Sequence, residues 1–471
     1  MIDSIPQNET QWRPFTGPAT VVRVTLPFWT EEIAQSIRVV VRMACEYVRA
    51  TVQTISVLQI GDVHFPDSRD KRLLDLKDKS MDALVANAAP HTLTKVVRAL
   101  AKIISHEPIS ALLLCGDLTT AGDLPNYSDC VKYLVDVLRL DSADKNNVHV
   151  VPGNHDVSRA LCTDKGALNR QKFAPLQSAW MENYDDVIVT QGVRGSDVSD
   201  SSRSVRIMSL NSCVGCGEWR MLPENIRNEL GEVLAGLRSK DPKAAFAIEG
   251  QQLDTPMFDN DDIEELHGQI KSLDSHVIPV VLAHHNLLPQ QLLRVELYTE
   301  LINSGQLRSA LSSIGRPIVY CHGHIHTDPI ETIIDGSVRN SQLICVSAPL
   351  LEAGFNELKF YFSRTDAPIG LEIIGYRLDT NGTIRDSIRR RIPFANRAKF
   401  LTSELECLRG CLTVDRTRFS ELQNTMNLAN PGEVDAANLV ELLHEAEWLG
   451  MLEIDNMNEK PQYWIIRRRW A

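Results

Sequence analysis

Histidine placement is the feature that most constrains this chain. Seven of its thirteen histidines fall in four short segments, and each segment follows an apolar run rich in Val, Ile and Leu. Such runs predict buried β-strands. Loops converge at the carboxyl ends of strands in an α/β sheet, so polar residues placed there can meet in one site. The seven are His64, His155, His284, His285, His322, His324 and His326.

Acidic and amide residues extend this pattern to five segments, which in chain order are LQIGDVH, LLLCGDLT, VVPGNHD, VVLAHHN and VYCHGHIH. Alternate residues of an extended D-x-H or H-x-H segment point the same way, so both can reach one ion or two adjacent ions. Imidazoles mixed with carboxylates and an amide suit Mn, Fe or Zn better than calcium. Each segment alone is weak evidence, but five in this order predict a two-metal centre.

The order D-x-H, G-D, G-N-H-D, H, G-H-x-H resembles the calcineurin-like metallophosphoesterase superfamily over residues of about 55–380. The resemblance implies an α/β fold, a four-layer α/β/β/α sandwich. It also implies two divalent transition metal ions (Mn, Fe or Zn, with Mn favoured). The ligands carried over from the family are Asp62, His64 and His326 for one ion, Asn154, His284 and His324 for the other, and Asp117 as the bridge.

The same resemblance gives His155 a catalytic role. In the family a metal-bound hydroxide attacks phosphorus in line, and this histidine stabilises the transition state or protonates the leaving oxygen. Asp156 would orient His155, and an Asx turn or helix cap is the open alternative for Asp156. We expect His284 rather than His285 to be the ligand, because the family motif uses its first histidine, although Asn286 replaces the usual proline. His322 is expected to be a strand-end or supporting residue.

The segment GDLTTAG resembles the cyclic-nucleotide phosphodiesterase branch of the superfamily more than its repair nucleases. We therefore expect a phosphodiesterase that acts on nucleotide or cyclic-nucleotide type phosphodiesters. The alternative is a metal-dependent DNA or RNA nuclease, directed by the C-terminal domain or by a partner protein. A third hypothesis, an inactive metal-bound scaffold, is disfavoured by the complete set of ligand residues.

Periodicity predicts three regions. Residues 1–50 form an N-terminal extension with a helix, and residues 51–385 form the domain whose motifs resemble the metallophosphoesterase family. In that domain strands alternate with helices over about 81–104 and 127–140 and from about 261 and 290, and residues 158–203 read as a surface excursion. Residues 400–471 contain three helical patterns and a terminal hairpin, which together resemble a winged-helix domain.

Charge limits the kind of partner. The formal net charge is -12, so the surface has no general attraction for phosphate backbones or anionic membranes. Residues 400–471 hold seven basic and twelve acidic residues. The cluster Arg467–Arg469, beside Trp464 and Trp470, is either a local nucleic-acid phosphate contact or a solvated strand end. Interaction with a protein partner, or self-association, is the better default for the C-terminal domain.

Cysteine usage and the absence of a leader or a long apolar run predict a soluble, cytoplasmic protein with no membrane segment. Cysteines at 45, 115, 130, 321 and 345 lie singly in apolar stretches and are expected to be buried thiols. Cys213 and Cys216 form one C-x-x-C without a partner pair. We therefore expect two free thiols in a loop rather than a zinc ribbon.

Overall fold

The computed structural model describes residues 54–65, 92–138, 147–162, 170–182, 188–289, 301–396, 401–429 and 435–469, apart from short gaps within some of these ranges. The helix expected within residues 1–50 and the one expected from residue 290 lie outside the described residues. So does the first part of the helix expected over 81–104.

The first sheet has six strands. The three neighbouring strands β1, β2 and β3, which form one half of the sheet, are parallel. Most of their residues are apolar and buried, as expected for strands covered on both faces. The other three strands pair antiparallel. In spatial order the sheet is β12 (Ile384–Pro393), β11 (Pro368–Leu378), β10 (Gly354–Phe362), β1 (Thr54–Ile60), β2 (Ile109–Leu114) and β3 (Val148–Val150).

The second sheet also has six strands, with a parallel centre of β5, β6, β7 and β9. Its spatial order is β4 (Arg194–Asp200), β5 (Arg203–Ser209), β6 (Val277–Leu282), β7 (Pro317–His322), β9 (Gln342–Ser347) and β8 (Ile330–Ile333). Residues 158–203, which the sequence predicts to be a surface excursion, contain the partly buried helix α6 (Ala174–Met181) and, at their end, β4. The polar segment RGSDVSD is the edge strand β4, held by its antiparallel ladder with β5 rather than by apolar burial.

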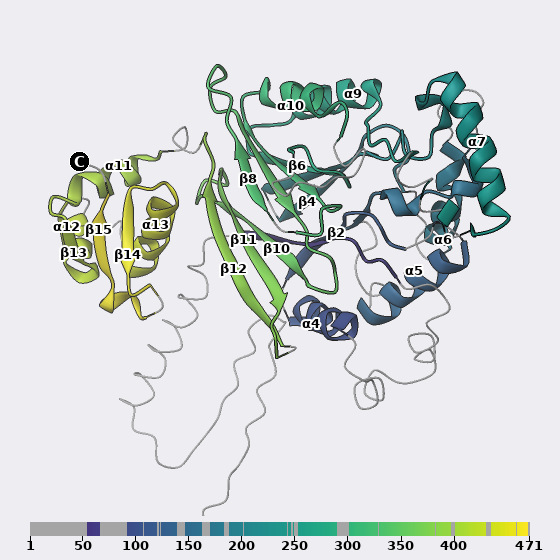
Figure 1. The fold of residues 1–471 in the computed structure, drawn as a ribbon. Helices are drawn as coiled ribbons and strands as arrows, with labels where there is room; N and C mark the ends of the chain where they lie inside the picture. Colours follow the sequence, from purple (N-terminus) through teal and green to yellow (C-terminus); the bar gives the residue numbers. More distant parts are fainter. Residues whose placement is uncertain are drawn as a thin grey trace, which may run out of the picture. The chain divides into compact units, whose positions relative to one another are not determined.

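Apolar side chains form a core between the two sheets and two more cores under helices, which gives a mixed α/β fold. Helices α4 (Thr92–His106), α5 (Leu124–Leu138) and α6 (Ala174–Met181) contribute to the core on the first sheet. Helices α9 (Asn260–Ser272) and α10 (Ser304–Ser312) cover the second sheet, on the side away from α4 (Figure 1). Within the described residues no helix has the length and apolar character needed to cross a membrane.

Residues 401–469, which we call the C-terminal module, contain the three helices and the hairpin that the sequence predicts. The elements are α11 (Ser403–Cys411), α12 (Phe419–Ala429), α13 (Ala436–Trp448), β14 (Leu452–Asp455) and β15 (Ile465–Arg468). The side chains of Thr402 and Asp435 cap α11 and α13 by accepting backbone N–H groups. A third strand, β13 (Arg416–Arg418), pairs with β15. Sequence patterning did not reveal it, because three residues are too few to show alternation.

Helix α13 packs against the outer strands of the first sheet. The ring of Trp448 lies 4.4 Å from the ring of Tyr361, between centroids. A side chain at Gly370 would prevent this packing, because a Cβ there would lie 2.6 Å from the Trp448 ring. Arg391, on β12, lies over the Trp448 ring and pairs with Glu447 at 3.2 Å. The last turn of α13 is therefore covered by the sheet.

Candidate metal centre

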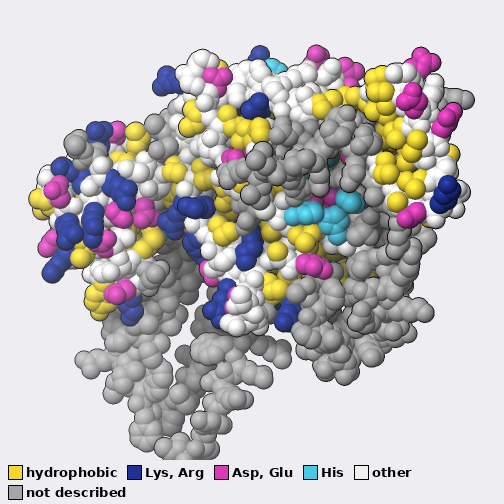
Figure 2. Space-filling model, viewed as in Figure 1, with side chains coloured by type: hydrophobic (Ala, Val, Ile, Leu, Met, Phe, Trp, Pro, Cys, Tyr) yellow, Lys and Arg dark blue, Asp and Glu magenta, His cyan; other side chains and the backbone are white. Residues whose placement is uncertain are grey.

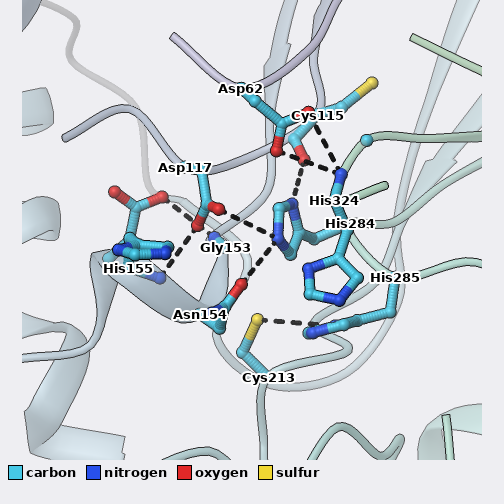
Figure 3. A network of polar contacts seen from close by, with 12 residues as sticks. Asp62, Cys115, Asp117, Gly153, Asn154, His155, Cys213, His284, His285 and His324 are labelled. Atoms are coloured by element: carbon cyan, nitrogen blue, oxygen red, sulfur yellow. Dashed lines mark hydrogen bonds and ion pairs between the residues drawn. The ribbon is translucent and has the colours of Figure 1, made fainter. Parts of the chain in front are cut away.

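The predicted ligands all follow strand ends and meet in one place. Asp62 and His64 follow β1, Asp117 follows β2, and Asn154 follows β3. On the second sheet, His284 follows β6, and His324 and His326 follow β7. Figure 3 shows residues from the two sheets converging around Asp117, and Figure 2 shows histidine side chains gathered where this region reaches the surface.

Backbone conformation sets four of these residues apart. His64, Asp117, His324 and His326 have φ values of 42°, 50°, 69° and 55°. Left-handed backbone is uncommon for residues other than glycine and costs roughly 1 kcal/mol or more at each position. Because the fold maintains this strain at four predicted ligands, the local structure is organised around the placement of their side chains.

Two glycines allow the loops after β2 and β3 to touch. Gly116 has a φ of 93°, and a Cβ on it would lie 2.7 Å from the backbone nitrogen of Gly153. A Cβ on Gly153 would lie 2.0 Å from Oδ1 of Asp117. Any side chain at Gly153 would thus displace the Asp117 carboxylate, which explains the glycine in each motif.

The two oxygens of Asp117 have different surroundings. Oδ1 accepts a hydrogen bond from the backbone N–H of His155 at 2.8 Å. Oδ2 lies 3.8 Å from Nε2 of His64 and 3.4 Å from Nε2 of His284. Although burial opposes ionisation, His284 and the other nearby histidines hold the pKa of Asp117 well below its usual range. Asp117 is therefore an ionised carboxylate with one oxygen facing both groups of ligands.

The first group contains Asp62, His64, Asp117 and His326, and one donor atom of each lies within 4.8 Å of the others. Nε2 of His64 is 3.2 Å from Nε2 of His326, which is 3.7 Å from Oδ1 of Asp62. Ligands on one ion with bonds of about 2.1 Å lie roughly 3 to 3.5 Å apart, so little movement is needed to bind one. Burial lowers the pKa of His64 to about 4, which keeps the imidazole neutral and able to coordinate.

The second group contains Asn154, His284 and His324. Nε2 of His284 lies 3.0 Å from Oδ1 of Asn154, and Nδ1 of His284 lies 2.7 Å from the carbonyl oxygen of Cys115. Because that carbonyl can only accept, Nδ1 donates its proton and Nε2 faces the site. The His324 ring lies 5.2 Å from the His284 ring, between centroids.

His285 lies in the same histidine cluster, with its ring 4.4 Å from the His324 ring between centroids, but its polar contacts differ from those of His284. The Ser212 hydroxyl accepts the backbone N–H groups of His284 and His285, at 3.2 and 3.1 Å, so its own proton donates to Nδ1 of His285 at 2.9 Å. His284, and not His285, therefore contacts both Asn154 and Asp117. His322 is buried at the end of β7, with Nδ1 3.0 Å from the carbonyl oxygen of Gly323.

The donor set fits two divalent transition metal ions. It combines imidazoles, carboxylates and an amide oxygen, and the Asp117 carboxylate lies between the two groups. The electrostatics favour a cation as well: against the effect of burial, Asp117 raises the pKa of His284 to about 10. A metal ion at this position would supply the positive charge that Asp117 attracts.

His155 and Asp156 lie beside the two groups. The ring of His155 meets the ring of His64 edge-on, with 4.9 Å between centroids, and it is partly exposed to solvent. The Asp156 carboxylate is fully buried and accepts backbone N–H groups of Leu118 and Gly153, at 3.0 and 2.9 Å. These bonds match the capping alternative for Asp156, and its orienting role toward His155 stays a prediction.

Asp254 and Arg159 belong to the site although sequence patterning did not reveal them. Nδ2 of Asn154 donates to Oδ2 of Asp254 at 3.2 Å, and Arg159 forms an ion pair with the same carboxylate. This contact fixes the amide of Asn154 so that Oδ1 faces His284. Asp254 lies 100 residues from Asn154 in a segment without a recognisable motif, so only the structure could reveal the pair.

Comparison with known proteins gives three findings. A model of the family described as calcineurin-like phosphoesterase matches residues 55–328. An uncharacterized metallophosphoesterase-like protein of Bacillus subtilis (strain 168), YydB, is 33% identical over 107 residues, which are 23% of this chain and 18% of YydB.

Among solved structures, GAP50, the anchor in the inner membrane complex of Plasmodium, has a TM-score of 0.39 at 11% identity, over 72% of this chain and 89% of GAP50. A 5'-nucleotidase precursor from Thermus thermophilus has a TM-score of 0.35 at 11% identity, over 71% of this chain and 56% of its own. Both TM-scores are below 0.5, so neither likeness adds to the assignment.

Proposed function

The chain belongs to the calcineurin-like phosphoesterase family of metal-dependent phosphoric ester hydrolases, and we propose that it is a binuclear phosphodiesterase acting on nucleotide or cyclic-nucleotide type diesters. The observation that carries this proposal is the geometry of Asp117, whose Oδ2 faces a histidine from each ligand group while Oδ1 is tied to the backbone of His155. The GDLTTAG resemblance supports the nucleotide diester. We interpret the two sheets and their helices as the family's four-layer sandwich.

In this proposal each residue has a distinct task. Two divalent transition metal ions, with Mn favoured, would supply Lewis acidity and activate water when bound. Asp62, His64 and His326 would hold one ion, Asn154, His284 and His324 the other, and Asp117 would hold both. Cys115 fixes the tautomer of His284 through its carbonyl, and Asp254 fixes the amide of Asn154. These contacts orient ligands before any ion binds.

His155 is the residue we propose for proton transfer to the leaving oxygen. Its backbone is fixed by Asp117, and its ring borders the first ligand group on a partly exposed side. A substrate phosphoryl group reaching the ligands from solvent would therefore meet this imidazole. General acid catalysis by a positioned histidine contributes typically about 10²- to 10⁴-fold to a rate.

Two features of the C-terminal module support a small substrate over a nucleic acid. We interpret the module as winged-helix-like, and in a DNA-binding winged helix the recognition helix enters the major groove. Here the corresponding helix, α13, packs through Trp448 against Tyr361 and Gly370. The arginines at and just after the end of the terminal strand are paired with acids of the module: Arg467 with Asp455, Arg468 with Asp415 and Arg469 with Glu453. A phosphate backbone would have to displace these partners.

The test is a substrate panel with Mn-supplemented full-length protein. It contains a chromogenic diester and monoester, cyclic mononucleotides, single-stranded and duplex DNA, and RNA. We expect hydrolysis of the diester and the cyclic nucleotides, lowered about 10²- to 10⁴-fold by His155→Ala. The matched control is His276→Ala, which removes an exposed histidine and should retain full activity. Cutting of DNA or RNA without turnover of small diesters would replace this proposal with the nuclease alternative.

A further inference from the structure

A second group of metal-ligand side chains adjoins the candidate metal centre and contains none of its proposed ligands, although a donor atom of His285 also lies within 4.8 Å of donor atoms of His284 and His324. It consists of Cys213, Cys216 and His285, which are 0%, 0% and 1% exposed. One donor atom of each lies within 4.8 Å of the other two, and Sγ of Cys213 is 3.8 Å from Nδ1 of His285. Figure 3 shows the Cys213 sulfur directed at the His285 ring. We call these three residues the thiol group.

The loop that carries both cysteines is held in a defined shape. Between them the backbone forms a turn, in which the N–H of Cys216 donates to the carbonyl of Cys213 at 3.1 Å. Gly217, directly after the turn, has a φ of 75°, which favours glycine. The buried ammonium group of Lys172 donates to the carbonyls of Val214 and Cys216, at 2.7 Å each, and to Glu218 at 2.8 Å. The two thiols are thus presented on a rigid loop.

Donor chemistry favours a soft divalent ion. Thiolate and imidazole ligands suit zinc, and a C-x-x-C turn supplies two of the four ligands in many zinc sites. In a tetrahedral zinc site a sulfur and a nitrogen ligand lie about 3.6 Å apart, close to the observed separation. Two thiolates, a neutral imidazole and a divalent cation sum to zero charge, which suits full burial. The Pro152 carbonyl, 3.3 Å from Sγ of Cys213, is an oxygen that could take the fourth position.

A reactive dithiol is the competing role for the same cysteines. Redox-active cysteines are usually accessible to solvent and have a lowered thiol pKa. Here both cysteines are fully buried, so they lack the solvent access that redox exchange requires. The geometry and the burial both favour coordination over redox exchange.

We propose that Cys213, Cys216 and His285 bind a third metal ion of the zinc type, distinct from the two proposed ions of the catalytic centre. Binding releases two thiol protons to solvent and replaces the Ser212 hydrogen bond to His285. The ion would connect the loop after β5 to the end of β6, which also bears His284. Because Cys216 forms a β-bridge with Asp254, the ion would also stiffen the support of Asn154.

Cobalt substitution of the full-length protein tests this proposal without relying on activity. A cobalt–thiolate bond gives a charge-transfer band in the near ultraviolet, and the proposed catalytic ligands contain no sulfur that could produce one. We expect this band in the wild type and in Asp117→Asn, and its loss in Cys213→Ser/Cys216→Ser. The control is Cys162→Ser, a cysteine that packs against the same cluster and should leave the band in place. A wild type without the band under reducing conditions, or a band that survives the double substitution, would overturn the proposal.

A second measurement covers the case in which the double variant does not fold. X-ray absorption at the zinc edge of wild-type protein loaded with zinc should show sulfur scatterers at about 2.3 Å, beside the nitrogen and oxygen shell of about 2.0–2.2 Å. A zinc environment with nitrogen and oxygen alone would contradict the third site. It would leave the proposed catalytic centre unaffected, because none of its ligands is a thiol.

Discussion

Two polar regions of the molecule use buried charge in opposite ways. At the candidate metal centre, the carboxylates of Asp62 and Asp117 are directed at histidines, and four of the ligand residues have left-handed backbones. Where α13 meets the first sheet, each buried acid faces arginine: Glu372 faces Arg391, and Glu445 faces Arg364. We propose that the first arrangement takes up added cations, whereas the second is neutralised by arginines of the chain itself.

This difference predicts that the metal centre serves activity and that the contact of α13 with the sheet serves stability. Burial raises the pKa of Asp62 to about 7, so an ionised carboxylate there is unfavourable in the protein alone. Real proteins tolerate such local costs at functional sites and offset them elsewhere. We therefore expect substitutions at the metal centre to change activity far more than folding, and substitutions at the contact of α13 to change folding far more than activity.

Asp117→Asn should have the largest effect. The amide is isosteric but lacks the negative charge that lies between the two ligand groups, so we expect hydrolysis of a generic diester in Mn to fall by about 10³-fold or more. The bound metal, measured by elemental analysis, should fall from about two ions at the catalytic centre. The same substitution at a partly exposed acid, Asp335→Asn, is the control and should change neither quantity. Near-normal turnover in Asp117→Asn would contradict the expectation that substitutions at the metal centre act mainly on activity.

The C-terminal module should show a pH effect through His444. This histidine lies on α13 beside Trp464, and burial, with a smaller contribution from Arg391, lowers its pKa to about 4 from about 6.5. Between these values the unfolded chain binds a proton that the folded chain does not, so stability is full above pH 6.5 and declines as the pH falls toward 4. The loss reaches about 3 kcal/mol.

Denaturation of the full-length protein at several pH values, followed by Trp464 fluorescence or by amide exchange in α13, measures this effect. His444→Gln removes the titrating group, so the difference between wild type and variant isolates it from the other histidines. A variant that loses as much stability as the wild type between pH 6.5 and 4 would assign the pH dependence to another region.

Asp254→Ala tests whether the contacts behind the ligands matter. Without Asp254 the Asn154 amide loses the acceptor that fixes its orientation, and outer contacts of this kind are typically worth about 10- to 100-fold in metal affinity. We expect the Mn concentration for half-maximal activity to rise by that factor, with less change at saturating Mn. Asp259→Ala is the matched control, because it breaks an Arg–Asp pair, with Arg170, that does not touch a proposed ligand. An increase in the Mn concentration for half-maximal activity in both variants would indicate a general loss of structure.

The contrast between Asp117 and Asp254 shows how far the sequence could predict this site. Asp117 follows a buried apolar strand and is preceded by glycine, so its segment could be recognised as one of five similar segments in a fixed order. Asp254 meets Asn154 through a loop 100 residues away, and no local pattern encodes such a contact. The same limit explains β4, whose polar residues are held by a ladder, and Lys172, a buried lysine that supports a distant loop. Strand cores and motif residues are local properties, whereas tertiary supports are not.

The smallest effect is expected for the ion pair that connects β12 to α13. Arg391 and Glu447 are 41% and 19% exposed, and pairs near the surface are worth about 0.2–1 kcal/mol. A double-mutant cycle with Arg391→Gln and Glu447→Gln, measured by urea denaturation, should give a coupling energy in that range and unchanged diester hydrolysis. The single change Arg391→Gln should cost more than Glu447→Gln, because it also removes the arginine 3.0 Å from the buried Glu372 and leaves Arg389, at 3.5 Å, as the cation beside that carboxylate. Equal costs for the two single variants would show that the Glu372 contact adds nothing, and the pairing of acids with arginines could not then explain how this region is stabilised.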